Sequence, residues 1–327
     1  SRLGELVNVR GADILLLSGD LFDGETVYRE TLEALAASLG AMHARVFIAP
    51  GNHDPYSARS PYALPIWPSN VHIFTSGEIE RVVLPELSCA VYGAAFTSSV
   101  QDEGLLQGFH APDDGLTHLM VLHGDLAADS RYDPVTKEQI AQSGLDYLAL
   151  GHTHRFGGVQ REGATFYACP GCPEGRGFDE LGEKGVYLGT LDASGCKLEF
   201  CPLSGRKYEI LTVPAGDDAI TAAENALPES TENDIYRIIF TGEAEPVALP
   251  EVYRALEGRF FSLSLRDVTT PKQDLWAAAG EDTLRGIFLR ELRQRYDAAD
   301  TPEEKQCIAD AARLGLAAMD GREAPEL

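Results

Sequence analysis

The residues best suited to chemistry lie in four short turns, each of which follows an apolar run. The turns are Gly19-Asp20, Gly51 to Asp54 ("GNHD"), His123-Gly124 and Gly151 to His154 ("GHTH"). Together they offer a carboxylate, a carboxamide and several imidazoles, and none of them contains a thiolate. This mixture of oxygen and nitrogen ligands is typical of a site for manganese, iron or zinc, and it is unlike a structural zinc site, which is rich in cysteine. Two such ions about 4 Å apart can activate a water molecule and stabilise both oxygens of an in-line phosphoryl displacement.

Each turn also has a purely structural interpretation. Asp20 alone could cap a helix, His123 could be a satisfied buried histidine, and "GHTH" could be a polar strand exit. The order of all four turns at strand ends favours a shared site over these alternatives. Asp23 is different, because it lies where it could cap the helix that follows it, and we predict that structural role.

The elements that would position these turns follow from the hydrophobic pattern. Strands are predicted in the stretches that lead into the four turns and at "CAVYGAAF" (89–96), with a helix over 25–40 and a hairpin over 185–203. This alternation of strand and helix indicates a layered α/β fold in which two sheets form a sandwich with helices outside. Ligands bind beyond the carboxyl ends of such strands, so the four turns can converge.

The C-terminal third carries no comparable turns. We predict a helix (219–227), a strand (234–242), a short helix (250–258) and a strand (260–268), followed by helices over 281–296 and 301–319. The predicted domains are therefore a core over 1–213, a small α/β capping domain over 214–270 and a helical segment over 271–327.

Composition limits the class of protein. The 327 residues carry a formal net charge of −24, which argues against bulk electrostatic coating of nucleic acid but leaves room for a local basic groove. The six cysteines are too dilute for a disulfide framework, so a cytoplasmic location is expected, and no apolar run is long enough to span a membrane. Cys169-Pro-Gly-Cys172 has redox or zinc spacing, but its surroundings favour a structural role.

The ordered set of turns resembles the calcineurin-like metallophosphoesterases. Within them, "LLLSGDLFD" and "LALGHTH" are similar to the SbcD-type DNA repair exonucleases, and "CPGCPEGRGFDELGEKGVYL" (169–188) is similar to their YhaO-like branch. The resemblance implies a metallophosphoesterase β-sandwich flanked by helices, with a small α/β capping domain and a helical C-terminal tail.

The resemblance also implies a role for each matched residue. Asp20 would bridge two divalent metal ions, most simply manganese, with iron or zinc as alternatives. The other metal ligands would be Asn52, His123 and His152 on the second ion and His154 on the first. His53 would be catalytic, as the general suitability of an imidazole as a proton donor also suggests, and Asp54 would orient it. On a loop near the site, Arg176 and Lys184 would contact phosphate, unless both simply solvate that loop.

One part of the family pattern is absent. The family begins with an Asp-x-His motif on a first strand, and no histidine precedes Asp20 here. We therefore expect that this strand is missing, that the first ion is poorly held and that this chain is poorly active. The sheet should also expose apolar surface or an unpaired edge unless another segment replaces the strand.

The leading functional prediction is a metal-dependent phosphodiesterase that digests DNA as a repair exonuclease. The family association implies an SbcC-type coiled-coil ATPase as partner, held by the C-terminal helices, and a homodimer through the core. One alternative keeps the chemistry but acts on a nucleotide or another small phosphoester. A second alternative is an inactive binding subunit of an ATPase complex.

Overall fold

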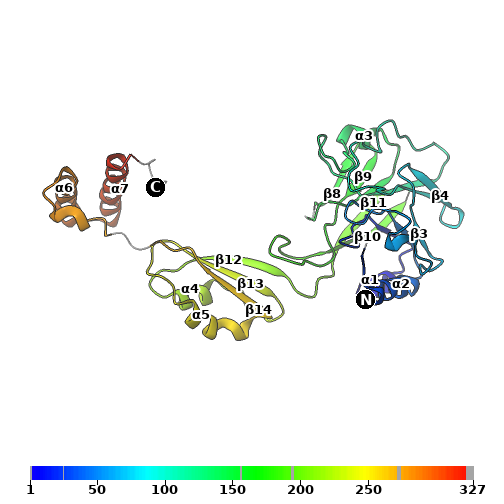
Figure 1. Cartoon of the computed structure of the whole chain (residues 1–327). Coiled ribbons are helices and arrows are strands. Elements are labelled where there is room, and N and C mark those ends of the chain that lie inside the picture. The colour runs from blue at the N-terminus through cyan, green and yellow to red at the C-terminus, as the bar shows by residue number, and fades with distance from the viewer. Residues whose placement is uncertain (1, 25, 155–156, 193–194, 271–273, 322–327) are drawn as a thin grey trace. The chain divides into compact units, whose positions relative to one another are not determined.

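The computed structural model describes residues 2–24, 26–154, 157–192, 195–270 and 274–321 (Figure 1). It divides into two compact units, which are treated separately below. The first comprises residues 1–209 with 233–235, and the second comprises 210–232 with 236–327.

A small parallel sheet opens the first unit. Its strands are β1 (Ile14–Leu17), β2 (Arg45–Ile48) and β3 (Val71–Ile73), in the order β1-β2-β3. The helices α1 (Arg2–Arg10) and α2 (Arg29–Gly40) pack against it through Val7, Leu32 and Leu39. β1 is an edge strand of this sheet, and all four of its residues are half-buried.

A six-stranded sheet forms the other layer, in the order β4-β5-β6-β7-β9-β8. The strands are β4 (Glu80–Leu84), β5 (Cys89–Gly93), β6 (Thr117–Leu122), β7 (Tyr147–Leu150), β8 (Val159–Glu162) and β9 (Thr165–Ala168). The inner pairs are parallel, whereas β4 and β8 add antiparallel edges. The short helix α3 (Lys137–Gln142) begins with a capping box between Thr136 and Gln139 and packs through Ile140.

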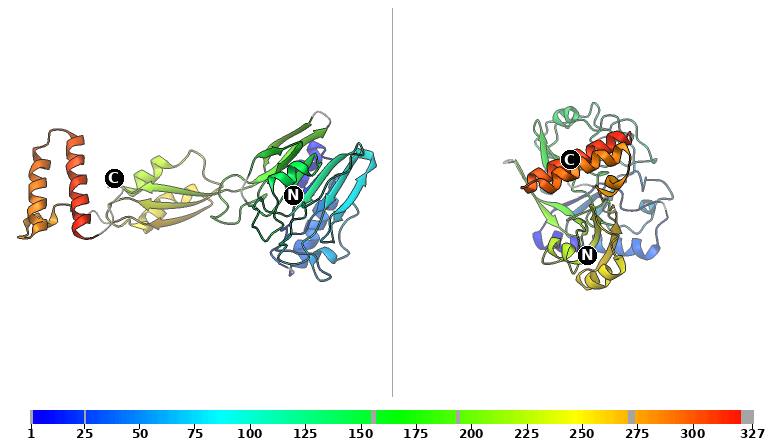
Figure 2. Two further views of the ribbon diagram at one scale, coloured as in Figure 1. Left: turned by 90° about the horizontal axis from the view of Figure 1, so that it is seen from above. Right: turned by 90° about the vertical axis from the view of Figure 1, so that its left-hand side faces the viewer.

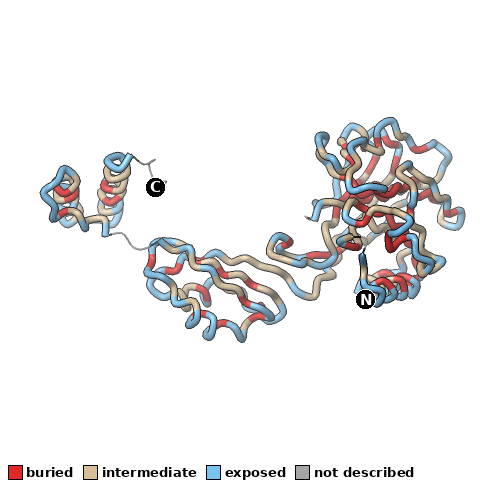
Figure 3. The backbone as a smooth tube through the Cα atoms, viewed as in Figure 1, coloured by how far each residue is buried: buried red, intermediate tan, exposed pale blue. Residues whose placement is uncertain are grey.

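Alternation along the strands explains why the two sheets pack face to face. In β2, Phe47 lies between the sheets, whereas Val46 and Ile48 face the helices. In β5, Val91 joins Phe47 in the inner cluster while Tyr92 points to the opposite face. Successive strand residues point to opposite faces, so a strand apolar on both faces is buried on both. Figure 3 shows buried residues along these strands. The predicted sandwich flanked by helices is confirmed.

Two details of the sequence prediction were wrong. The helix predicted from residue 25 begins at Arg29, after Tyr28 in extended conformation, and Glu25 lies outside the described residues. Asp23 does not cap it, because the carboxylate accepts a hydrogen bond from Arg176 Nη1 at 2.6 Å instead. Asp23 lies several residues before Tyr28, the residue at the N-cap position, whereas the exposed guanidinium of Arg176 is within hydrogen-bond distance of its carboxylate.

The predicted hairpin is present as β10 (Gly185–Asp192) and β11 (Gly195–Pro202), which pair antiparallel along their full length. Short 3-10 helices also interrupt the loops of the chain. They are η1 (Pro61–Ala63), η2 (Pro85–Leu87), η3 (Glu257–Arg259) and η4 (Ala277–Gly280).

The second unit contains a three-stranded sheet and four α-helices among its described residues. β12 (Tyr208–Pro214), β13 (Ile235–Thr241) and β14 (Ser262–Asp267) pack on α4 (Ala219–Ala226) and α5 (Leu249–Leu256). The helices α6 (Leu284–Ala298) and α7 (Pro302–Met319) lie side by side (Figure 2). The element types predicted for this part are present, whereas the domain boundaries at 213 and 270 stay predictions, and 271–273 and 322–327 lie outside the described residues.

Within the described part of the chain, no helix combines the length and apolarity needed to cross a bilayer.

Candidate metal centre

The four turns leave the carboxyl ends of four parallel strands. Asp20 follows β1 and Asn52 follows β2, both in the three-stranded sheet. His123 follows β6 and His152 follows β7 in the six-stranded sheet. The site is therefore assembled at one end of the sandwich from both of its layers, as the sequence pattern predicts for such sheets.

Three ligand-type atoms converge at this end. The Nε2 atom of His123 lies 2.8 Å from Asn52 Oδ1 and 3.4 Å from Asp20 Oδ2. On the other side of the ring, His123 Nδ1 donates to the carbonyl oxygen of Ser18 at 2.8 Å. The imidazole is thus held by the backbone with Nε2 turned toward the two oxygens.

The protonation of His123 makes this a place for a cation. The side chain is 2% exposed, and burial lowers its pKa against the opposing effect of Asp20. In the neutral ring the proton lies on Nδ1, since that atom donates to Ser18, and Nε2 carries a lone pair. Three electron-rich atoms then face one another without a proton between them, and a positive ion would satisfy all three.

His152 borders the same group. Its Nδ1 lies 3.3 Å from Asn52 Oδ1, and its ring packs on Tyr132 with 4.7 Å between ring centroids. His152 (φ 70°) and Asp20 (φ 52°) both have a left-handed backbone conformation, which residues other than glycine rarely adopt. Strain of this kind gathers at functional sites, where the surrounding structure enforces it.

Glycines make room for these contacts. A Cβ atom on Gly51 would lie 2.2 Å from Asp20 Oδ1, and one on Gly151 would lie 2.0 Å from the Ser18 carbonyl oxygen. Neither neighbour can retreat, because one is a ligand-type oxygen and the other is backbone. The turns can approach one another only where the chain has no side chain.

Asp54 is fully enclosed, with 1% of its surface exposed. Its Oδ1 accepts from the backbone amides of Asp20 (3.1 Å) and Gly51 (2.7 Å), and its Oδ2 accepts from the amide of Phe22 (3.1 Å) and the hydroxyl of Tyr62 (2.5 Å). Three donors are backbone amides of the surrounding turns and the fourth is the Tyr62 hydroxyl on η1, so none of these four contacts comes from the His53 ring. The geometry therefore shows Asp54 anchoring the surrounding backbone, and its predicted orientation of the His53 imidazole stays a prediction.

His53 is exposed at the rim of the centre. Its backbone amide donates to Asp20 Oδ1 at 3.0 Å, which fixes the residue beside the bridging carboxylate that the family pattern implies. The imidazole is free to meet a substrate from solvent. This placement suits a proton donor, and the catalytic role of His53 stays a prediction.

Comparison with known proteins identifies this part of the chain. Residues 2–156 match the family model described as calcineurin-like phosphoesterase. The segment 2–156 is a calcineurin-like phosphoesterase domain. Calcineurin-like phosphoesterases are metal-dependent phosphoester hydrolases, and the match covers all four turns.

A curated relative extends the similarity beyond this domain. The chain is 30% identical over 224 residues to the uncharacterized metallophosphoesterase YhaO of Bacillus subtilis (strain 168). The alignment covers 65% of this chain and 52% of that relative, so this chain spans about half the length of the relative it matches.

The donor set of the calcineurin-like phosphoesterase domain fits a divalent ion. Among the described residues, no three side chains drawn from His, Cys, Asp and Glu alone gather closely enough to hold a metal, so the amide oxygen of Asn52 is integral to the set. Asp20, Asn52, His123 and His152 would hold one ion. Mixed oxygen and imidazole ligation of this kind is common to manganese, iron and zinc.

His154 stands apart from that group. Its Nδ1 lies 2.7 Å from Oε1 of Glu180, a buried carboxylate on the loop beyond the family match. The contact leaves Nε2 of His154 as the nitrogen available to an ion. Its predicted place on a separate ion stays a prediction.

The two residues predicted to contact phosphate have different positions. Arg176 is exposed, and its guanidinium pairs with Asp23 on the turn that follows β1. Lys184 is buried, and its Nζ donates to the backbone carbonyl of His154 at 3.2 Å. Neither lies simply in solvent, and Lys184 supports the backbone of the "GHTH" turn.

Sequence reasoning missed three residues here: Asp125, Tyr132 and Glu180. Asp125 directly follows His123-Gly124, and its Oδ2 lies 3.9 Å from His152 Nε2, so its adjacency to the motif was a usable signal. Tyr132 and Glu180 reach the site from loops whose course no local pattern predicts.

Proposed function

We propose that this protein is a metal-dependent phosphodiesterase that hydrolyses DNA as an exonuclease, with two divalent ions, manganese first among them. The observation that carries the proposal is the convergence of Asp20, Asn52 and His123 beside His152 and below an exposed His53. Such ions, when bound, activate a water molecule and stabilise charge on the phosphoryl oxygens.

The residues of this chain supply the remaining functions. His123 and Asn52 present lone pairs from fixed positions, which limits the reorganisation needed to bind an ion. His53, on the open side, would donate a proton to the oxygen that leaves the phosphorus. The similarity of residues 169–188 to DNA repair exonucleases supports DNA as the substrate, and Arg176 would contact a phosphate of the strand once it exchanges Asp23 for that anion.

A small phosphodiester is the second candidate substrate. The charge of −24 favours it, because a strongly acidic chain repels a long polyanion wherever basic residues do not gather.

The experiment combines ion binding with cleavage by residues 1–327. Manganese binding is measured by calorimetry, and cleavage is followed on end-labelled linear DNA and, in parallel, on bis(p-nitrophenyl) phosphate. His53→Ala is the test variant, and His43→Ala, another exposed histidine outside the four turns, is its matched control.

We expect wild type and His43→Ala to shorten DNA at a low rate, since the Asp-x-His motif is absent from this chain, and His53→Ala to bind manganese without shortening DNA at all. Cleavage of the small diester alone would overturn the DNA substrate while keeping the hydrolase. Manganese binding without any cleavage would instead favour the inactive binding subunit, and absence of manganese binding would overturn the metal centre.

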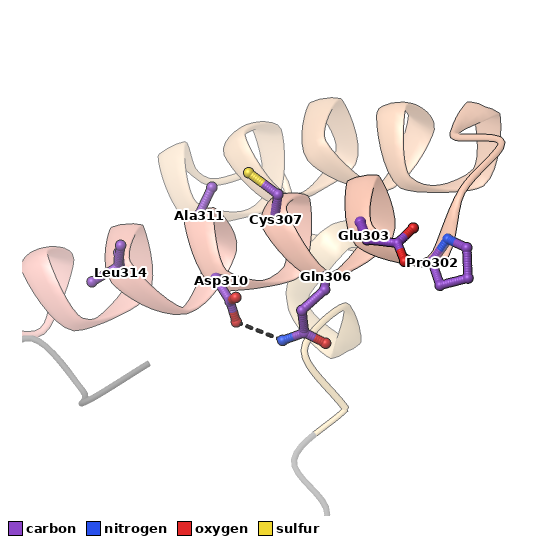
Figure 4. Close-up of a pocket in the computed structure, with 7 residues that line it drawn as sticks. All are labelled: Pro302, Glu303, Gln306, Cys307, Asp310, Ala311 and Leu314. Atoms are coloured by element: carbon purple, nitrogen blue, oxygen red, sulfur yellow. Dashed lines mark hydrogen bonds between the residues drawn. The ribbon is translucent and has the colours of Figure 1, made fainter.

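The proposed partner of the coiled-coil ATPase type would contact α7. A shallow groove on that helix combines the apolar side chains of Cys307, Ala311 and Leu314 with the acidic Glu303 and Asp310 (Figure 4). We propose that a helix of such an ATPase packs in this groove. Leu314→Glu should therefore abolish co-purification of the ATPase with this protein, while manganese binding persists. A homodimer through the core is also proposed, and sedimentation of the isolated chain tests it. The cytoplasmic location stays a prediction.

A further inference from the structure

Glu180 is a buried acid outside the four turns. Its side chain is 5% exposed, and both of its oxygens have partners. Oε1 lies 2.7 Å from His154 Nδ1, and Oε2 accepts from the backbone amide of Arg176 at 2.7 Å. Burying a carboxylate costs free energy unless hydrogen bonds compensate for the lost water. These two contacts supply that compensation and fix the Glu180 carboxylate in its orientation toward the His154 ring.

This contact determines which nitrogen of His154 is free. A carboxylate accepts hydrogen bonds and donates none, so it selects the tautomer with the proton on Nδ1. The lone pair then lies on Nε2, on the side of the ring away from Glu180. Pairing of one ring nitrogen with a carboxylate is how proteins orient histidines that bind metals through the other nitrogen.

The His154 side chain needs such support. It is 46% exposed, and among the described residues no ring packs on it as Tyr132 packs on His152. Without the carboxylate, the ring would rotate and exchange tautomers in contact with water.

The loop that carries Glu180 also holds the backbone of the same turn. The Sγ of Cys169 donates to the Thr153 carbonyl oxygen at 3.1 Å, and the buried Lys184 donates to the His154 carbonyl oxygen. The segment 169–184 therefore fixes both the path of the "GHTH" turn and the orientation of its last side chain.

We propose that Glu180 is a positioning residue that holds His154 with Nε2 directed to a divalent cation, which makes the segment 169–184 a working part of the metal centre. The inference rests on the proposed function for the cation, but the orientation of His154 can be measured without metal or substrate.

The test follows His154 directly. The ¹⁵N signals of its ring are recorded in metal-free protein, at a pH where the ring is neutral, for wild type, Glu180→Gln and Glu180→Ala. Glu183→Gln, a change at an exposed acid three residues away, is the matched control. Manganese affinity is then measured for the same four proteins.

We expect wild type, Glu183→Gln and Glu180→Gln to keep the proton on Nδ1, because a glutamine oxygen still accepts it. Glu180→Ala should show a mixture of tautomers and bind the more weakly held manganese ion, the one assigned to His154, about 10- to 100-fold more weakly, the usual loss when the partner of a metal-binding histidine is removed. Glu180→Gln should fall between the two in affinity.

An unchanged tautomer in Glu180→Ala, or manganese affinity within twofold of wild type, would overturn the inference. If Glu180→Ala fails to fold, Glu180→Gln decides: affinity equal to wild type would contradict a role for the carboxylate charge. A tautomer change in a protein that cleaves no DNA would leave the positioning role intact while the proposed function fails.

Discussion

The carboxylate of Asp54 accepts a hydrogen bond from the backbone amide of Asp20, so the last residue of the "GNHD" turn holds the residue that ends the turn after β1. The same oxygen atom accepts from Gly51 within its own turn. Two turns that are more than thirty positions apart thus share one buried anchor, and the placement of Asp20 depends on it.

Asp54→Ala should be strongly destabilising. It leaves three backbone amides and the Tyr62 hydroxyl without their acceptor, and one buried unsatisfied donor alone costs about 1–3 kcal/mol. We expect a loss of about 3 kcal/mol or more in the free energy of unfolding, measured with urea. Asp113→Ala, a change at an exposed acid, should stay within about 0.5 kcal/mol of wild type. Equal urea midpoints for the two variants would contradict the anchor.

Gly151→Ala should disrupt the centre through sterics alone. The new methyl group would lie 2.0 Å from the Ser18 carbonyl oxygen, the acceptor that orients His123. We expect a lower melting temperature and at least about tenfold weaker manganese binding, comparable to loss of an outer contact of a ligand. In Gly258→Ala the methyl group meets open space, so both quantities should remain as in wild type. The steric account fails if the two alanine variants behave alike.

Tyr132→Ala should weaken metal binding modestly. The Tyr132 ring packs on His152 with an interplanar angle of 30°, and such aromatic pairs contribute about 0.5–1.5 kcal/mol. The corresponding loss of manganese affinity is about 2- to 10-fold, measurable by calorimetry. Tyr132→Phe should retain the affinity, and Tyr28→Ala, at an exposed tyrosine, controls for loss of a ring. A loss in Tyr132→Phe as large as in Tyr132→Ala would place the effect in the hydroxyl instead.

Asp133 should make stability depend on pH. Burial raises its pKa from the ordinary 3.8 to about 7, and Oδ2 has no hydrogen-bond partner among the described residues. Because the pKa of Asp133 is higher in the folded protein than in the unfolded chain, its contribution to the free energy of unfolding is fully present below about pH 4. That contribution is lost as pH rises through about 7.

Asp133→Asn should remove this dependence. Asparagine has nearly the same volume, tolerates the left-handed backbone at φ 50° and can still accept from the amide of Leu105. Above pH 7 the variant should exceed wild type in unfolding free energy by up to about 4 kcal/mol, with the gap closing toward pH 4. Urea titrations at several pH values measure it, with the exposed Asp129→Asn as control. Parallel pH profiles for wild type and Asp133→Asn would be the contrary result.

The sequence predicts most of the fold and half of the site for physical reasons. Strands buried on both faces, such as the one around Phe47, leave an unbroken apolar run, and glycine turns mark where those runs end. The positions of Asp20, Asn52, His123 and His152 follow from that pattern together with the rule that ligands gather at the carboxyl ends of strands.

The remainder depends on contacts between distant segments. Glu180 contacts His154 across 26 positions of sequence, and Tyr132 contacts His152 from a loop that includes left-handed backbone. No local periodicity in the sequence indicates either contact. Asp23 shows the same limit, because its place before a helical pattern suggested a cap, whereas its actual partner Arg176 is 153 positions away. The four hydrogen-bond donors to the Asp54 carboxylate likewise come from segments that no local sequence pattern connects to it.

The distribution of the four turns between two sheets has a mechanical consequence. An ion held by Asp20 and Asn52 on one side and by His123 and His152 on the other would cross-link the two layers of the sandwich. Its binding energy would then resist separation of the layers, because the unfolded chain cannot assemble the same ligands. Chelation would loosen the whole domain, so susceptibility to proteolysis would report how fully the centre is loaded, even in the absence of any substrate.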